Sequence, residues 1–190
     1  MRTIRTARLR LTPVTAQNAD ALWAVLQQPD LRTFQDLPAV TASTFVGMVA
    51  RRPQRLRPGQ PGRFEWLIYG HKMRKPLGWV SLRVPERERS CGEIGYSIVR
   101  ESRGRGIATE AVRALVAEAF ELAALARVKA YCVPENAASR RVLERSGFET
   151  DGLLSNGASV NGELVDVLAH VLPRERWAQS GKTIEISASA

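Results

Sequence analysis

Residues 91–109 read Cys-Gly-Glu-Ile-Gly-Tyr-Ser-Ile-Val-Arg-Glu-Ser-Arg-Gly-Arg-Gly-Ile-Ala-Thr. Apolar residues alternate from Ile94 to Ile98, which predicts a strand with one buried face. A turn with two glycines, Gly104 and Gly106, joins this strand to a helical pattern. Such a junction gathers unpaired backbone N–H groups at the positive end of the helix dipole, and both favour a bound phosphate. The segment therefore predicts a site for a phosphorylated cofactor.

The turn also carries two arginines, Arg103 and Arg105, whose charges favour an anion. It is not a Walker loop, because no Gly-Lys-Ser/Thr follows, and the third glycine of a dinucleotide-binding fingerprint is absent. From Ile107, apolar residues recur every three or four positions, which predicts a helix over about 106–122. Glu110 near its start suits the helix dipole. This ordered context favours a phosphate loop over the alternative, a solvated turn.

A second strand and helix follow between residues 127 and 148. Alternating residues predict a strand over 127–133, and the chain then reaches Asn136, a suitable N-cap for a helix over 136–146. Gly147 can adopt the left-handed conformation that ends such a helix.

Motifs in these segments resemble those of the GCN5-related N-acetyltransferases (GNAT). Arg103-x-x-Gly106-x-Ala108 resembles the acyl-CoA pyrophosphate loop of that family, and Asn136-x-x-Ser139 with Gly147-Phe148 is similar to the motif after the next strand. The Asn-x-x-Ser form resembles the RimJ/RimL-type branch. So do the opening Thr6-Ala-Arg-Leu-Arg-Leu-Thr-Pro13 and the closing Asp166-Val-Leu-Ala-His-Val-Leu-Pro-Arg-Glu-Arg-Trp177. The resemblance covers roughly residues 4–177.

The resemblance and the order of elements predict an α+β (mixed α/β) fold of the GNAT type. Its centre would be a mostly antiparallel twisted sheet of about seven strands, splayed at the cofactor site and flanked by about four helices. We expect strands at about 6–13, 63–70, 76–84, 91–99, 127–133, 149–157 and 164–172, and helices at about 16–28, 41–51, 106–122 and 136–146. Residues 1–177 are expected to form one domain, followed by a flexible tail over 178–190.

Composition agrees with a single globular domain. The chain has 190 residues, and 44% of them are hydrophobic. It contains no run of about 18 apolar residues for a membrane span and no apolar segment of a signal peptide. Cys91 and Cys132 fall on predicted strands, which indicates buried thiols of a cytoplasmic protein. His71 and His170 belong to no spacing typical of a metal site, so we expect no metal.

The net charge of +9 is concentrated in the first half of the chain. Residues 1–100 carry 17 Lys and Arg against 7 Asp and Glu, whereas residues 101–190 carry 11 against 12. The densest cluster is the Pro- and Gly-rich segment Arg51–Arg63, with five arginines. It is either a solvated loop or a site that attracts an acidic partner such as rRNA or an acidic peptide. It contains no aromatic residue for base stacking.

The resemblance implies acetyl-CoA as the acyl donor, bound where the strands at 91–99 and 127–133 part. Backbone groups of Ile98 and Arg100 would contact its pantetheine arm. The turn residues would hold its pyrophosphate: Arg103, Gly104, Arg105, Gly106, Ile107, Ala108 and Thr109. Asn136 would orient the pantetheine amide or brace the gap between the strands, although helix capping explains it almost as well.

Acyl transfer to an amine requires a base for the ammonium group, a stabilised oxyanion and a hydrogen-bond donor for the thiolate. The resemblance implies Glu93 as the base, because a carboxylate on an otherwise apolar strand can be desolvated. Alternatively, Glu93 faces outward and pairs with an arginine, and water relays remove the proton. Leu143 stands where the superfamily commonly has a tyrosine. Ser139 then matches the role of donor to the CoA sulfur, unless it only bonds its own helix.

These inferences predict a cytoplasmic acetyl-CoA-dependent N-acetyltransferase. Direct transfer in a ternary complex is expected, because no cysteine lies at a plausible nucleophile position. The acceptor would be a primary amine, first the α-amino group of a protein or peptide, with ribosomal proteins typical of the branch. An amino-bearing small molecule or antibiotic is the alternative substrate. A different class of alternative is a non-catalytic acyl-CoA sensor or an RNA-docking module. The sequence leaves the oligomeric state open, a homodimer included.

Overall fold

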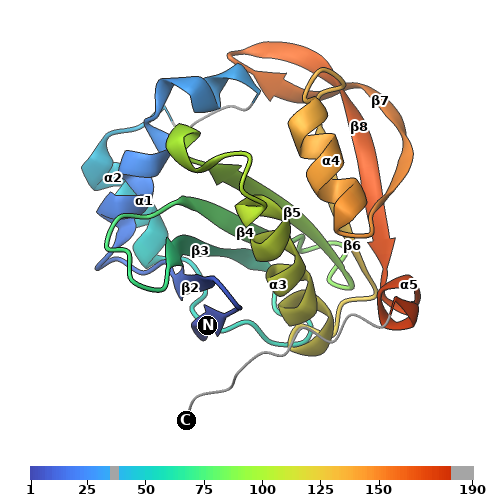
Figure 1. Ribbon diagram of the computed structural model, residues 1–190, viewed down its shortest axis with the longest axis horizontal. Coiled ribbons are helices and arrows are strands. Elements are labelled where there is room, and N and C mark those ends of the chain that lie inside the picture. The colour runs from blue at the N-terminus through green and yellow to red at the C-terminus, as the bar shows by residue number, and fades with distance from the viewer. Residues whose placement is uncertain (35–38, 181–190) are drawn as a thin grey trace.

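An eight-stranded sheet forms the centre of the protein in the computed structural model, which describes residues 1–34 and 39–180 (Figure 1). Its strands are β1 (Ile4–Arg5), β2 (Leu9–Pro13), β3 (Gly62–Gly70), β4 (Gly78–Val84), β5 (Cys91–Ile98), β6 (Arg127–Cys132), β7 (Glu149–Val160) and β8 (Glu163–Pro173). They are hydrogen-bonded in the order β1-β2-β3-β4-β5-β6-β8-β7. Neighbours are antiparallel except for β5 and β6, which run parallel.

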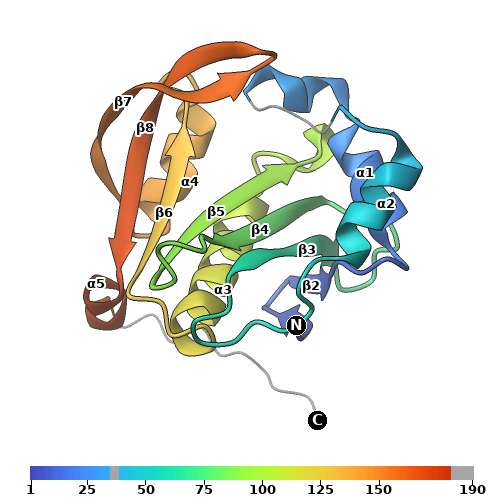
Figure 2. The ribbon, with the colours of Figure 1, turned by 180° about the vertical axis from the view of Figure 1, so that it is seen from behind.

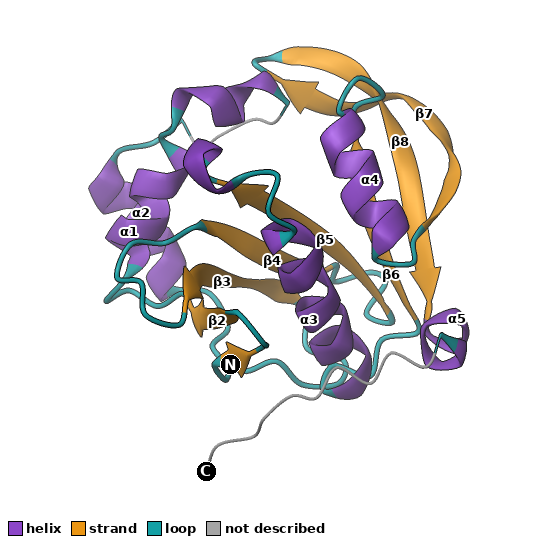
Figure 3. Cartoon of the chain, in the orientation of Figure 1, coloured by secondary structure: helices purple, strands orange, loops and turns teal. Residues whose placement is uncertain are grey.

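Helices cover both faces of this sheet. They are α1 (Ala19–Leu26), α2 (Ala42–Ala50), α3 (Ile107–Glu121), α4 (Ala137–Arg145) and α5 (Arg174–Gln179), with the 3-10 helices η1 (Pro29–Thr33) and η2 (Arg100–Ser102). α3 and α4 lie on one face, whereas α1 and α2 lie on the other (Figures 1, 2 and 3). Among the described residues, no helix has the length and apolar character that crossing a membrane requires.

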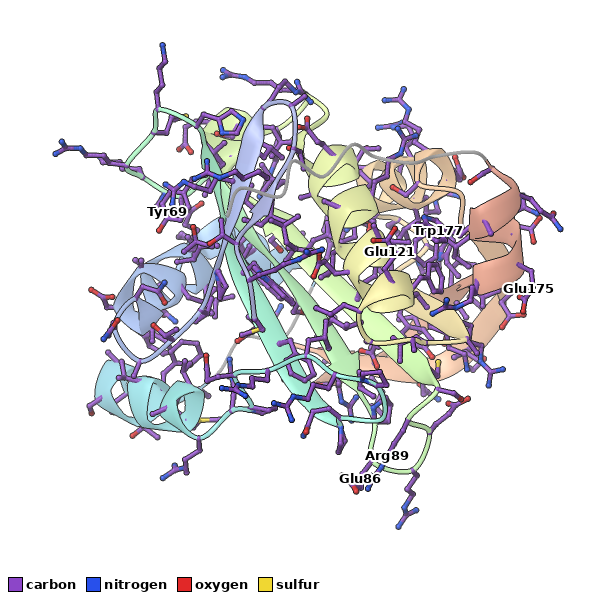
Figure 4. All side chains as sticks on the ribbon, turned by 90° about the horizontal axis from the view of Figure 1, so that it is seen from below. Tyr69, Glu86, Arg89, Glu121, Glu175 and Trp177 are labelled. Atoms are coloured by element: carbon purple, nitrogen blue, oxygen red, sulfur yellow. The ribbon has the colours of Figure 1, made fainter. Side chains whose placement is uncertain are left out.

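The two-residue period of the strands divides the core between these faces. Trp66, Ile68 and Val80 are buried in the cluster that α3 joins. Their neighbours Leu67 and Trp79 are buried in the separate cluster formed with α1 and α2. The strands are therefore apolar on both sides and bind the two helical layers into one body. At the C-terminal end of α3, the ring centres of Phe120 and of Trp177 from α5 lie 5.2 Å apart, close to Glu121 (Figure 4).

β5 and β6 part after a short stretch of pairing. Their parallel register joins Cys91–Glu93 to Arg127–Lys129 and ends there, although β5 continues to Ile98 and β6 to Cys132. Figure 2 shows the two strands diverging beyond this point. Backbone groups on the facing edges are thereby released from the sheet, and such groups require other partners. The predicted α+β fold, with a mostly antiparallel central sheet that parts between these two strands, is confirmed.

Several details differ from the sequence-based expectations. The sheet has eight strands rather than about seven, because the two-residue β1 pairs with β2. The hairpin between β7 and β8 turns only at Asn161-Gly162, where both residues have positive φ. Asn156, also at positive φ, lies inside β7, where the register shifts. α5 covers residues that we had not expected to be helical, and the predicted flexible tail falls mostly on 181–190, outside the described residues.

The arginine-rich segment Arg51–Arg63 is not a uniformly solvated loop. Arg52 forms an ion pair with Glu65, whose side chain is only 3% exposed. The guanidinium carbon of Arg52 also lies 5.5 Å from the ring centre of Phe45. Arg63 belongs to β3, and its Nε donates to the other oxygen of Glu65 at 2.9 Å. Two of the five arginines therefore neutralise one buried carboxylate.

We predict that Arg52→Gln lowers the free energy of unfolding by about 2 kcal/mol, because Glu65 keeps only Arg63 as a charged partner. Arg51→Gln is the matched control, since Arg51 is exposed at the end of α2 and should change stability by less than about 0.5 kcal/mol. Urea unfolding of both variants makes the measurement. Equal stabilities would show that the ion pair contributes nothing.

Candidate active site

A cavity of about 530 Å³ lies where β5 and β6 diverge. Its wall is made by the end of β5, the turn before α3, the last residues of β6, one side of α4 and part of η1. Such a volume is typical of a small-molecule site. The sheet alone cannot form it, because each wall comes from a different segment of the chain.

The turn before α3 presents free backbone donors to this cavity. Gly104 and Gly106 both have φ of +74°, a left-handed conformation that other residues adopt only with strain. Gly106 is the N-cap of α3, and the first helical hydrogen bond runs from Glu110 N to Gly106 O at 3.1 Å. The helix therefore leaves the N–H groups of residues 107–109 unused. We call residues 103–109 the phosphate loop.

Arginines add positive charge at the same place. Arg103 Nε donates to Ile98 O at 2.9 Å, and its Nη2 forms an ion pair with Asp30 Oδ2 at 2.5 Å. Arg141 and Arg145 of α4 also line the cavity. Asp30 is the one acidic residue among the described lining residues, so the cavity has an excess of positive charge that suits a polyanion.

A hydroxyl pair lies on the α4 side of the cavity. Tyr96 OH is 2.8 Å from Ser139 Oγ, and Asn136 Oδ1 accepts from Ser139 N at 3.0 Å as the N-cap of α4. Burial raises the pKa of Tyr96 well above its ordinary value, against the opposing hydrogen bond with Ser139, so the phenol keeps its proton. The nearby thiol of Cys132 also has a pKa raised by burial. This side of the cavity offers neutral hydroxyl donors.

Most of the predicted binding residues come together here. The cavity is lined by Ile98, Arg103, Gly104, Gly106, Ile107, Ala108, Thr109, Asn136 and Ser139. Arg100, in η2, and Arg105 are exposed and lie outside this lining. Glu93 is outside it too: its side chain is 38% exposed, and its carboxylate lies 3.4 Å from Arg83. Because Glu93 and Tyr96 have opposite parity on β5, they point to opposite faces of the sheet.

Several residues that line the cavity were not predicted from the sequence. Tyr96 belongs to an apolar alternation that gives no sign of a polar role, although its parity with Ile94 and Ile98 places it on the same face. Asp30 lies in η1, whose contact with the phosphate loop spans more than seventy residues and leaves no local signal. Cys132 lines the cavity as the last residue of β6, a position that the sequence pattern did not indicate.

Comparison with known proteins agrees with this geometry. The family described as "Acetyltransferase (GNAT) domain" matches residues 8–149. The chain belongs to this GNAT family. N-acetyltransferase p20 of Bacillus licheniformis, described as uncharacterized, is 28% identical over 179 residues, which is 94% of this chain and 99% of that protein. The Escherichia coli ribosomal-protein-serine acetyltransferase is 30% identical over 91 residues, 48% of this chain and 51% of that one.

A solved relative has the same fold. The structure of RimL, described as a ribosomal L7/L12 alpha-N-protein acetyltransferase in complex with coenzyme A, superimposes with a TM-score of 0.77. It is 20% identical and covers 90% of this chain and 98% of its own. The chain described here is therefore an N-acetyltransferase of the GNAT type, and its acyl donor is acetyl-CoA. The free N–H groups, left-handed glycines and arginines of the cavity fit a phosphate-bearing donor.

We predict that Gly106→Val raises the KM for acetyl-CoA at least about tenfold, because any side chain at this left-handed position strains the phosphate loop and obstructs close approach of a phosphate. Gly59→Val is the matched control: Gly59 has φ of +70° in an exposed turn outside the cavity. Calorimetry with acetyl-CoA on both variants tests the assignment. Unchanged affinity in the Gly106 variant would contradict it.

Proposed function

We propose that this GNAT enzyme transfers the acetyl group directly to the α-amino group of a protein or peptide, with a ribosomal protein as the acceptor type. The proposal of a peptide acceptor is supported by a row of charged side chains beside the point where β5 and β6 diverge. Arg83, Glu93 and Lys129 are consecutive partners across β4, β5 and β6, all partly exposed on the α1–α2 face. A row of polar side chains across neighbouring strands suits an extended chain better than a small molecule, which usually binds in a concave apolar pocket. The names of RimL and of the E. coli relative support the same acceptor type.

The proposed chemistry divides between the two faces of the sheet. Ser139, backed by Tyr96, donates a hydrogen bond to the sulfur that leaves, and backbone groups of β5 at the splay stabilise the oxyanion. The amine approaches from the opposite face, where Glu93 lies. Glu93 remains the proposed base, directly or through water, and its contact with Arg83 is also what an outward-facing strand residue would make.

Direct transfer is retained in this proposal although Cys132 lines the cavity. A nucleophilic cysteine must be a thiolate, and burial raises the pKa of Cys132, so its thiol stays protonated. A cytoplasmic location belongs to the same proposal, because both cysteines are free and buried.

Release of free CoA across a panel of N-terminal peptides and small amines tests the acceptor class. We expect turnover with peptides. Turnover confined to small amines would replace the proposal with a small-molecule acetyltransferase. Thermal stabilisation by acetyl-CoA without any turnover would indicate a sensor, and RNA affinity with a steep salt dependence would indicate a docking module.

We predict that Ser139→Ala lowers kcat about a hundredfold and leaves the KM for acetyl-CoA nearly unchanged, because the hydroxyl acts when charge develops on sulfur. The helix start should survive, since Asn136 accepts from the backbone N–H of residue 139. Ser146→Ala is the control at the C-cap of the same helix: Ser146 Oγ donates to Val142 O at 2.7 Å, and Ser146 itself does not line the cavity. Equal kcat values for the two variants would remove Ser139 from the mechanism.

The exposed arginines Arg51, Arg55 and Arg57 are proposed to attract an acidic acceptor, whereas Arg52 is excluded because it pairs with Glu65. Replacing the three by glutamine should lower kcat/KM for an acidic peptide several-fold at low ionic strength. The loss should vanish toward about 0.5 M salt, where the screening length is about 4 Å.

The charge-matched control replaces Lys72, Arg74 and Lys75, which are exposed in the turn between β3 and β4. If both triple variants lose the same activity, only the net charge matters. A loss that persists at high salt would indicate specific contacts instead of steering.

A further inference from the structure

The opening motif Thr6–Pro13 contacts the start of α3. Arg8 Nε donates to Glu110 Oε2 at 2.6 Å, and Arg8 N donates to Glu110 Oε1 at 3.0 Å. Thr6 Oγ1 donates to the same Oε1 at 2.5 Å. A carboxylate in the first turn of α3 is thus held by three donors from a segment about a hundred residues earlier in the chain.

Arg8 also binds the phosphate loop itself. Its Nη1 donates to Arg105 O at 3.0 Å, and its Nη2 lies 3.4 Å from the position that a Cβ of Gly106 would occupy. The peptide between residues 105 and 106 is trans, so its C=O and N–H point in opposite directions. With the carbonyl turned to Arg8, the N–H of Gly106 turns away from Arg8, and Gly106 lines the cavity.

The same contacts control the charge near the bound anion. A carboxylate on the first turn of a helix stabilises the helix dipole but repels a phosphate at that end. Burial alone would raise the pKa of Glu110, yet the hydrogen bonds from Thr6 and Arg8 hold it below its ordinary value. The carboxylate is therefore ionised, and the guanidinium of Arg8 offsets its charge beside the phosphate loop.

We propose that Arg8, assisted by Thr6, is a positioning residue for acetyl-CoA: it fixes the Arg105–Gly106 peptide and neutralises Glu110, so that the phosphate loop is preorganised for the pyrophosphate. We call this set Arg8, Thr6 and Glu110 the brace. The proposal rests on the assignment of the pyrophosphate to the phosphate loop.

The chain provides a matched control for the brace. Arg2, also near the N-terminus, pairs with Glu118 of α3 at 2.6 Å, the same distance as Arg8 Nη2 to Glu110. The arginines are 50% and 56% exposed. Glu118 lies about two turns further along the helix, so this pair does not touch the phosphate loop. Both pairs tie the N-terminal segment to α3, but only one can act on the ligand.

Calorimetric titration of Arg8→Gln and Arg2→Gln with acetyl-CoA separates the two roles. We expect Arg8→Gln to weaken binding about tenfold, a usual effect of losing charge-assisted hydrogen bonds, and to keep kcat near wild type at saturating acetyl-CoA. Arg2→Gln should bind acetyl-CoA as the wild type does, while lowering Tm at least as much. Arg8→Lys keeps the positive charge but loses the planar guanidinium that donates to Glu110 and to Arg105 O together. The affinity of this variant for acetyl-CoA should therefore lie between those of wild type and Arg8→Gln.

S-acetylpantetheine, which lacks the pyrophosphate, provides the second arm. Its kcat/KM should be the same in wild type and Arg8→Gln. Equal acetyl-CoA affinities in wild type and Arg8→Gln, or equal losses in Arg8→Gln and Arg2→Gln, would overturn the brace. So would a loss that persists with S-acetylpantetheine. If Gly106→Val weakens binding while Arg8→Gln does not, the brace fails and the loop assignment stands; if neither weakens it, the loop assignment itself fails.

Discussion

The parallel pairing of β5 and β6 ends after three residues, and the architecture of the site depends on that ending. Main-chain donors and acceptors released from a sheet must find other partners, because leaving them buried and unpaired costs free energy. Here the strands diverge into a cavity whose remaining walls are the phosphate loop, α4 and η1. In the proposed site, a donor with an amide-rich arm and a phosphate group would supply partners to both the strand edges and the helix start. The unpaired edge is thus the proposed binding surface.

Two carboxylates of this GNAT enzyme that are largely shielded from solvent are each contacted by more than one hydrogen-bond donor. The buried carboxylate of Glu65 is shared by Arg52 and Arg63, and Glu110 is shared by Arg8 and Thr6. Arg8 and Thr6 reach Glu110 from about a hundred residues earlier in the chain, and Arg52 reaches Glu65 from the segment before β3, so these contacts also join parts of the fold. The 28 Lys and Arg residues therefore overstate the number of cationic side chains that are free to act on a partner, since several arginines are already paired within the structure.

Because side chains alternate in direction along β5, the groups proposed to take part in the reaction lie on two faces of the sheet. Tyr96 points to the α3–α4 side, where Ser139 lies, whereas Glu93 points to the α1–α2 side, beside Arg83. A thioester in the splay would meet hydroxyl donors on one side and an incoming amine on the other. In the proposed mechanism the amine would form its bond to the carbonyl carbon from one side while the thiolate leaves that carbon on the other, and this arrangement needs only the two-residue period of one strand.

Much of this was readable in the sequence because it is local. The run from Cys91 to Thr109 predicts a strand, a glycine turn and a helix by periodicity and backbone freedom, and Asn136 predicts its helix start by capping. What the sequence could not show is contact between distant segments. The pairing of Arg8 with Glu110, of Asp30 with Arg103 and of Tyr96 with Ser139 has no periodic signature. Which charges are neutralised, and which hydroxyl meets which, is decided only when the tertiary structure brings these segments together.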